Sequence, residues 1–164
     1  MNESGEAPDV TAQRAAEAIH ASQDGDAWVT AHLGATNYHT TITARDHTII
    51  ADEPIESGGQ DTGPTPYDLL LAALATCMSM TVRMYATRKK WPLEEVVVRL
   101  RTARAPSAHA HDCVECDVRD TGLTRLERQV ELRGELSEEQ RARLLDIADR
   151  CPLKRTLERG LQIV

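Results

Sequence analysis

Aromatic residues are scarce in this sequence: phenylalanine is absent, and aromatic residues make up only 3% of 164 residues. Proteins that bind single-stranded nucleic acids stack bases on aromatic side chains, so this chain has little to offer that mode of binding. The chain also has fewer basic than acidic residues. It has 19 Lys and Arg and 26 Asp and Glu, which gives a net charge of −7. The composition therefore argues against nucleic acid and against an anionic membrane surface as partners.

A long uninterrupted apolar run is also missing. The uncharged apolar run, residues 69–82, has 14 residues, whereas a helix needs about 20 to span a bilayer. The N-terminal segment is acidic and lacks the apolar core of a signal peptide. We expect a soluble, cytoplasmic protein with no membrane partner, a mobile tail over residues 1–26 and a single domain over residues 27–164.

Alternating and helical patterns of apolar residues together predict an α+β fold with antiparallel sheets. Strands are expected at residues 28–33, 40–43, 47–51, 95–100 and 128–134, with a hairpin turn at 44–46 and a closing strand at 161–164. Helices are expected at residues 65–90, from Ser137 to the Cys151-Pro152 step, and at 153–159.

The first long helix carries the clearest local signals. Thr65 is a good N-cap, Pro66 suits the first helical position, and Asp68 completes a capping box. Residues 69–80 are apolar on every side, so we expect this helix to be buried all round. A single small sheet would leave much of it uncovered, and we therefore expect a homodimer.

Two cysteines are candidates for thiol chemistry. Cys77 lies in the middle of the apolar helix, and Cys151 directly precedes Pro152, which should make it the N-cap of the last helix. There the helix dipole would lower its thiol pKa. Each cysteine alone also fits simple core packing. If the two meet, one thiolate can attack a peroxide, and the second thiol can condense with the resulting sulfenic acid to a disulfide.

The other two cysteines, Cys113 and Cys116, form a Cys-x-x-Cys motif close to His109 and His111. This is metal-ligand spacing, but a second ligand pair further along the chain is missing. A zinc-stabilised domain is therefore the weaker hypothesis beside surface thiols or a local disulfide.

Residues 58–86 contain a glycine-rich loop, the run Pro-Tyr-Asp-Leu-Leu-Leu-Ala-Ala-Leu, and Cys77 eleven residues after Pro66. These features resemble the OsmC/Ohr family of organic hydroperoxide reductases, and the sequence Asp-Arg-Cys-Pro at 149–152 resembles the second hallmark of that family. The apolar run and the extra Cys-x-x-Cys are closest to one subgroup. The likeness extends over residues 27–164, as an OsmC-like domain.

The resemblance implies an intertwined homodimer in which antiparallel sheets wrap around long buried central helices. It implies that Cys77 is the peroxidatic nucleophile and Cys151 the resolving partner in a cysteine-based peroxidase with an antioxidant role. Organic hydroperoxides would be reduced to alcohols, and a dithiol or a lipoyl-bearing protein would reduce the enzyme. No metal or organic cofactor is expected.

The chain departs from the family pattern at two polar positions. Tyr67 stands where well-characterised members have a glutamate, and the stretch 37–39 lacks the arginine that pairs with it. Asp68 is one residue out of register, while Arg45 or Arg83 would have to supply the positive charge from elsewhere. Tyr67 could instead donate a hydrogen bond to the thiolate or the peroxide.

These departures leave open a second hypothesis, a non-enzymatic dimeric module that binds a small hydrophobic ligand or senses redox state. A hydrolase that uses Cys77 as acyl nucleophile has little support, because no His/Asp partner has recognisable spacing.

Overall fold

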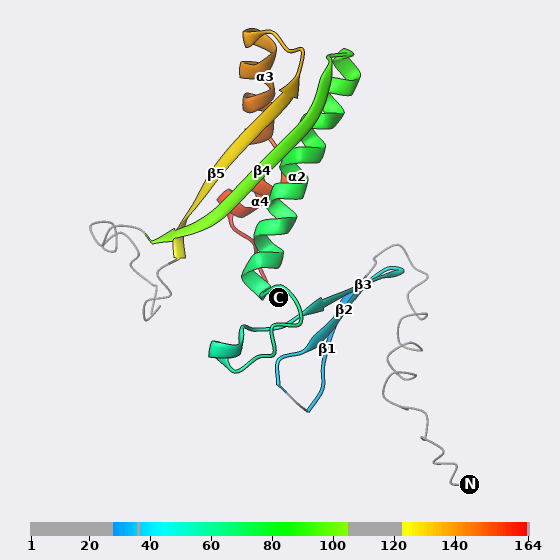
Figure 1. Ribbon diagram of the computed structural model, residues 1–164, viewed down its shortest axis with the longest axis vertical. Coiled ribbons are helices and arrows are strands. Elements are labelled where there is room, and N and C mark those ends of the chain that lie inside the picture. The colour runs from blue at the N-terminus through cyan, green and yellow to red at the C-terminus, as the bar shows by residue number, and fades with distance from the viewer. Residues whose placement is uncertain (1–27, 36, 105–122, 164) are drawn as a thin grey trace. The chain divides into compact units, whose positions relative to one another are not determined.

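The computed structural model describes residues 28–35, 37–104 and 123–163. Three strands, a short 3-10 helix, a long helix, two long strands and two further helices follow one another along these residues (Figure 1). The chain divides into two compact units, residues 1–68 and 69–164, and each is considered by itself. The combination of helices with antiparallel sheets confirms the predicted α+β class.

The first unit contains a three-stranded antiparallel sheet. Its strands lie in the order β1 (Val29–Leu33), β2 (Thr40–Ala44) and β3 (His47–Ala51). Ala44 pairs with His47, so the turn between the last two strands consists of Arg45 and Asp46. Arg45 has φ 54°, in the left-handed region that tight two-residue hairpins require. The predicted hairpin is therefore confirmed, with a turn one residue shorter than the expected residues 44–46 because Ala44 pairs in β2.

The second unit packs helices against a long β-hairpin. Its elements are α2 (Pro66–Lys89, whose first three residues belong to the first unit), β4 (Leu93–Arg104), β5 (Leu123–Gly134), α3 (Glu138–Asp149) and α4 (Pro152–Arg159). Both strands extend beyond their predicted bounds and pair from Leu93 opposite Gly134 to Arg104 opposite Leu123. Alternate side chains pack against buried clusters, on the face that the sequence predicted: Val96, Val98, Leu100, Val130 and Leu132.

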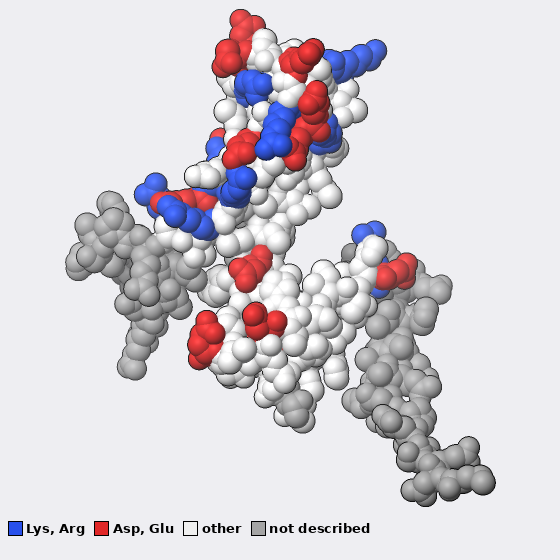
Figure 2. Space-filling view, in the orientation of Figure 1, with Lys and Arg blue, Asp and Glu red and all other residues white. Residues whose placement is uncertain are grey.

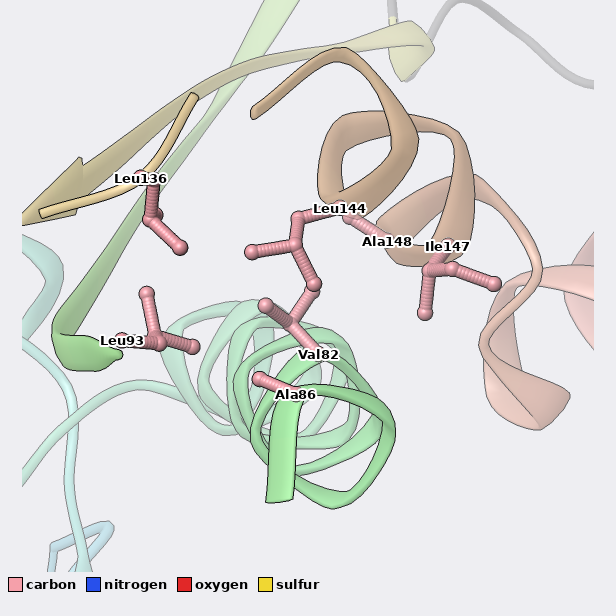
Figure 3. Close-up of a cluster of buried hydrophobic side chains, with 7 residues drawn as sticks. All are labelled: Val82, Ala86, Leu93, Leu136, Leu144, Ile147 and Ala148. Atoms are coloured by element: carbon pink, nitrogen blue, oxygen red, sulfur yellow. The ribbon is translucent and has the colours of Figure 1, made fainter. Parts of the chain in front are cut away.

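The larger hydrophobic core lies where α2 meets α3. Val82 and Ala86 of α2 face Leu144 and Ala148 of α3, and Leu93 lies at the start of β4 beside them (Figure 3). All five side chains are buried. The helical spacing that the sequence showed on α3 therefore identified its core face correctly.

Helix α2 buries only one stripe of side chains in this chain. The buried residues recur every four positions: Leu74, Met78, Val82 and Ala86. Met80 and Met84 remain 61% and 64% exposed, and Figure 2 shows an uncharged surface along the middle of the helix. In the single chain β4, β5 and α3 cover one side of the helix, and burial of its other side by a homodimer stays a prediction.

By length and composition alone α2 is also apolar enough to cross a membrane, with a mean hydropathy of 1.5 over its most apolar 18 residues. Core helices of soluble proteins pass the same test. In this chain α2 makes a core with α3 and a β-hairpin along one side, and 22% of that window is buried.

The chain ends differ from expectation in one respect. Residues 161–163 have no regular structure, so the predicted closing strand does not form over them. The predicted tail over residues 1–26 lies outside the described residues, and the single domain over residues 27–164 stays a prediction.

Candidate functional site

The glycine-rich loop before α2 closes around a buried carboxylate that the sequence reading missed. Asp52 is 2% exposed and accepts hydrogen bonds from the Thr62 hydroxyl at 2.7 Å and from the backbone N–H groups of Glu53, Gln60 and Thr62. The Thr62 hydroxyl, together with the three backbone donors, lowers the pKa of Asp52 although burial opposes the shift. The sequence feature that could have identified this carboxylate is Asp52-Glu53-Pro54, which directly precedes the loop.

The glycines are required by close approach of this loop to β3 and Asp52. A Cβ atom at Gly59 would lie 1.8 Å from the carbonyl oxygen of Glu53, and one at Gly63 would lie 2.4 Å from that of Ile50. Any larger residue would push these backbones apart. The short 3-10 helix η1 (Ile55–Ser57) completes the loop.

The start of α2 forms the predicted capping box. The Thr65 hydroxyl accepts a hydrogen bond from the Asp68 N–H at 3.2 Å, and the Asp68 carboxylate accepts from the Thr65 N–H at 3.1 Å. The Thr65 hydroxyl also donates to that carboxylate at 2.8 Å. Asp68 therefore has a structural role at the helix start, while the neighbouring Tyr67 is 51% exposed.

The second unit brings Cys77 and Cys151 together. Cys151 is fully buried and forms a small apolar cluster with Leu74 and Met78 of α2. Cys77, which is half-buried on α2, packs against this cluster, as do residues of β4 and α4. Both thiols are free. Two cysteines that lie 74 positions apart in sequence thus share one apolar environment.

Cys151 is the N-cap of α4, as predicted from the following proline. Its φ and ψ are −60° and 139°, and its Sγ accepts a hydrogen bond from the backbone N–H of Lys154 at 3.3 Å. The expectation of a lowered pKa is wrong, however. Burial raises the pKa of the Cys151 thiol above its ordinary value, and this outweighs the hydrogen bond from Lys154.

Cys77 itself also favours the protonated form of Cys151. A hydrogen bond with Cys77, and the negative charge of a Cys77 thiolate, both raise the pKa of Cys151. Burial and the neighbouring Cys77 thus both favour the protonated thiol of Cys151, and Cys77 is the more exposed of the two side chains. The pair is asymmetric, and their roles as nucleophile and partner stay predictions.

The basic residues expected beside Cys151 are engaged in ion pairs. Lys154 contacts Glu158 at 2.6 Å and Asp149 at 3.6 Å through its Nζ. Arg128 of β5, which the sequence did not single out, lies 2.5 Å from the same Asp149 carboxylate. Arg150 is turned to Asp146 instead. A network of paired charges thus surrounds the helix junction that holds Cys151.

The two arginines proposed to replace the family cation lie in different units. Arg45 lies in the β2–β3 turn of the first unit. The guanidinium of Arg83 donates hydrogen bonds to the carbonyl oxygens of Leu93 and Glu94, the latter at 2.7 Å. This contact ties α2 to the start of β4 and gives Arg83 a structural role.

The residues of the alternative metal site, Cys113, Cys116, His109 and His111, lie outside the described residues. Within residues 28–35, 37–104 and 123–163, no group of three or more His, Cys, Asp or Glu side chains is arranged to hold a metal ion. The zinc hypothesis stays a prediction.

Comparison with known proteins supports the resemblance. The family model described as OsmC-like protein matches residues 58–164. None of the curated proteins matches the chain.

Solved structures with the same fold come from distant relatives. An OsmC-like protein from Mycoplasma pneumoniae is 22% identical with a TM-score of 0.64, over 83% of this chain and 89% of that one. A hypothetical protein from Aquifex aeolicus is 14% identical with a TM-score of 0.60, over 85% and 92%. An organic hydroperoxide resistance protein from Elizabethkingia anophelis is 17% identical with a TM-score of 0.53, over 85% and 91%. At these identities the likeness establishes the fold.

Proposed function

Because this chain belongs to the OsmC-like protein family, we propose that it is a thiol-dependent peroxidase that reduces organic hydroperoxides to alcohols. The name of the Elizabethkingia anophelis protein supports a role connected with organic hydroperoxides. The observation that carries the proposal is the packing of Cys77 against the buried cluster that contains Cys151. The subgroup with Pro-Tyr-Asp-Leu-Leu-Leu-Ala-Ala-Leu and the extra Cys-x-x-Cys is part of the same proposal.

In the first step, the Cys77 thiolate attacks the terminal oxygen of the hydroperoxide. A sulfur–oxygen bond forms, the O–O bond breaks, and Cys77 is oxidised to a sulfenic acid. The leaving alkoxide takes up a proton and departs as the alcohol. Cys151, which burial keeps protonated, is the neighbouring thiol that can supply this proton.

In the second step, the Cys151 thiolate attacks the sulfur of the Cys77 sulfenic acid. A disulfide forms and the hydroxyl group leaves as water after protonation. An external dithiol, or a lipoyl-bearing protein, then reduces the disulfide and is itself oxidised to a disulfide. The net reaction converts one hydroperoxide and one dithiol to one alcohol, one water and one disulfide, with no metal or organic cofactor.

The decisive test is consumption of cumene hydroperoxide in the presence of dithiothreitol. We expect Cys77→Ser to abolish it, because a serine hydroxyl is not ionised near neutral pH. Cys113→Ser is the matched control, since it makes the same exchange at a cysteine to which the proposal gives no role. A Cys77→Ser protein as active as the parent would contradict the proposal.

We also propose that the chain acts as a cytoplasmic homodimer. In the single chain, α2 leaves Leu70, Met80 and Met84 exposed, at 38%, 61% and 64%. A second copy would remove this apolar surface from water, at about 25 cal/mol for each Å² buried.

The alternative is a non-enzymatic module of the same fold that binds a small hydrophobic ligand or senses redox state. The positions of Asp68 and Arg83 favour it, because both make structural hydrogen bonds rather than contacts to a thiol. Mass spectrometry after brief exposure to cumene hydroperoxide separates the two functions. Rapid formation of a Cys77–Cys151 disulfide supports the peroxidase, whereas persistent free thiols support the passive module.

A further inference from the structure

Arg128 of β5 projects from the face of the β4–β5 hairpin that packs against the cysteines. It lies directly opposite Leu100 in the strand register, and opposite residues of an antiparallel pair share one face. Leu100 packs against the buried cluster that contains Cys151. Arg133, which forms a cross-strand ion pair with Glu95 at 2.8 Å, lies an odd number of positions along β5 from Arg128. It therefore projects from the opposite face of the hairpin.

An ion-pair network joins Arg128 to the helix junction that holds Cys151. The Arg128 guanidinium lies 2.5 Å from the carboxylate of Asp149, which is the last residue of α3. The Nζ of Lys154, on α4, lies 3.6 Å from the same carboxylate. The backbone N–H of Lys154 in turn donates to the Sγ of Cys151 at 3.3 Å. Asp149 therefore connects β5, the end of α3 and the first turn of α4.

Helix α4 is weakly held by its own residues. It has eight residues, none of which is buried, and a helix this short is not stable by itself in water. Its partly buried leucines, Leu153 and Leu157, pack against the cluster that contains Cys151. The orientation of Cys151 at the N-cap consequently depends on what holds the junction of α3 and α4 to the sheet.

We propose that Arg128 and Asp149 are positioning residues, which hold the Cys151 sulfur where it can form a disulfide with Cys77. In that step Cys151 loses its proton and its sulfur bonds to the sulfur of the Cys77 sulfenic acid, while the S–O bond breaks. The hydroxide that leaves takes up the proton and departs as water. A disulfide has a narrow geometry, so a small displacement of one sulfur opposes its formation. The inference rests on the proposed function, because this disulfide is the product of its second step.

The simpler role of the Arg128–Asp149 pair is to stabilise the fold, as a cross-strand pair such as Arg133–Glu95 does. The two roles predict different measurements. A stabilising pair changes the free energy of unfolding, whereas a positioning pair changes the effective concentration of one thiol toward the other. Partly exposed ion pairs contribute little to stability, so the chain should remain folded without either pair.

The test is equilibration of the full chain with reduced and oxidised glutathione, in a Cys113→Ser/Cys116→Ser background that leaves Cys77 and Cys151. Oxidised glutathione takes up two electrons and two protons from the protein dithiol. The ratio of protein disulfide to dithiol then gives the effective concentration of the two thiols. We expect Arg128→Gln to lower it at least about tenfold, and Arg128→Lys, which keeps the charge, to recover part of the loss. Arg133→Gln is the matched control and should leave it unchanged.

A second readout uses cumene hydroperoxide and dimedone, which traps a sulfenic acid. Arg128→Gln should accumulate more trapped Cys77 than the parent, because the second thiol reacts more slowly. No Cys77–Cys151 disulfide in the parent, an unchanged effective concentration in Arg128→Gln, or equal losses in Arg128→Gln and Arg133→Gln would overturn the proposal. A loss confined to Arg128→Gln, without trapped sulfenic acid in any variant, would support the positioning role and contradict the peroxidase alone.

Discussion

The backbone N–H of Lys154 donates a hydrogen bond to the Sγ of Cys151 across 3.3 Å. The sulfur thereby caps the first turn of α4, a position that usually favours a thiolate. Yet the same sulfur is fully buried among apolar side chains, and burial keeps the thiol protonated. Cys151 is consequently held in position but not ionised, which suits a thiol that acts second.

The first prediction concerns a Cys151→Ser variant. Without the second thiol, a Cys77 sulfenic acid cannot be converted to the intramolecular disulfide. We expect one turnover with peroxide, followed by overoxidation of Cys77 to sulfinic acid under excess peroxide. Intact-protein mass spectrometry would detect two added oxygen atoms. Continued turnover without overoxidation would mean that another thiol resolves the intermediate.

The second prediction concerns the pH dependence of stability in the reduced protein. Because burial raises the pKa of Cys151 above its ordinary value of 9.0, the folded state keeps a proton that the unfolded chain releases. The associated stability is present below about pH 9 and is lost as the pH rises through the higher folded pKa. Urea unfolding of the parent and of Cys151→Ala should therefore give free energies that converge above about pH 9. A difference that stays constant through this range would contradict the assignment, since other titrating groups are common to both proteins.

A third prediction addresses the exposed face of α2. Met84→Glu places a charge where the proposed homodimer buries apolar surface, so it should shift the protein toward monomer. Size-exclusion chromatography with light scattering measures the mass. Leu161→Glu is the control, because Leu161 is similarly exposed, at 63% against 64% for Met84, and lies outside the helix. A parent protein that is itself monomeric would refute the dimer.

The fourth prediction tests the glycine-rich loop. In Gly63→Ala, the new Cβ would lie 2.4 Å from the carbonyl oxygen of Ile50, and the backbone must move. We expect a loss of about 1–3 kcal/mol in the free energy of unfolding, as is usual for overpacked sites. Gly34→Ala is the control, since a Cβ atom added there would have no neighbour within 4 Å. Equal stability of the two variants would show that the loop adjusts without cost.

The sequence by itself determined the local elements. The N-cap position of Cys151 before Pro152, the capping box of Thr65 and Asp68, and the hairpin around Arg45 were all predicted from short-range patterns. These features depend on backbone geometry within a few residues, so neighbours in sequence specify them. The alternation of Val96, Val98 and Leu100 likewise identified the buried face of β4.

Only the tertiary structure decided how distant groups meet. In the folded chain, Cys77 packs against the cluster of Cys151, and Arg83 donates hydrogen bonds to carbonyl groups of β4. Folding also raises rather than lowers the pKa of Cys151. The sequence showed the helix dipole at Cys151, but desolvation depends on which side chains from other elements surround the sulfur.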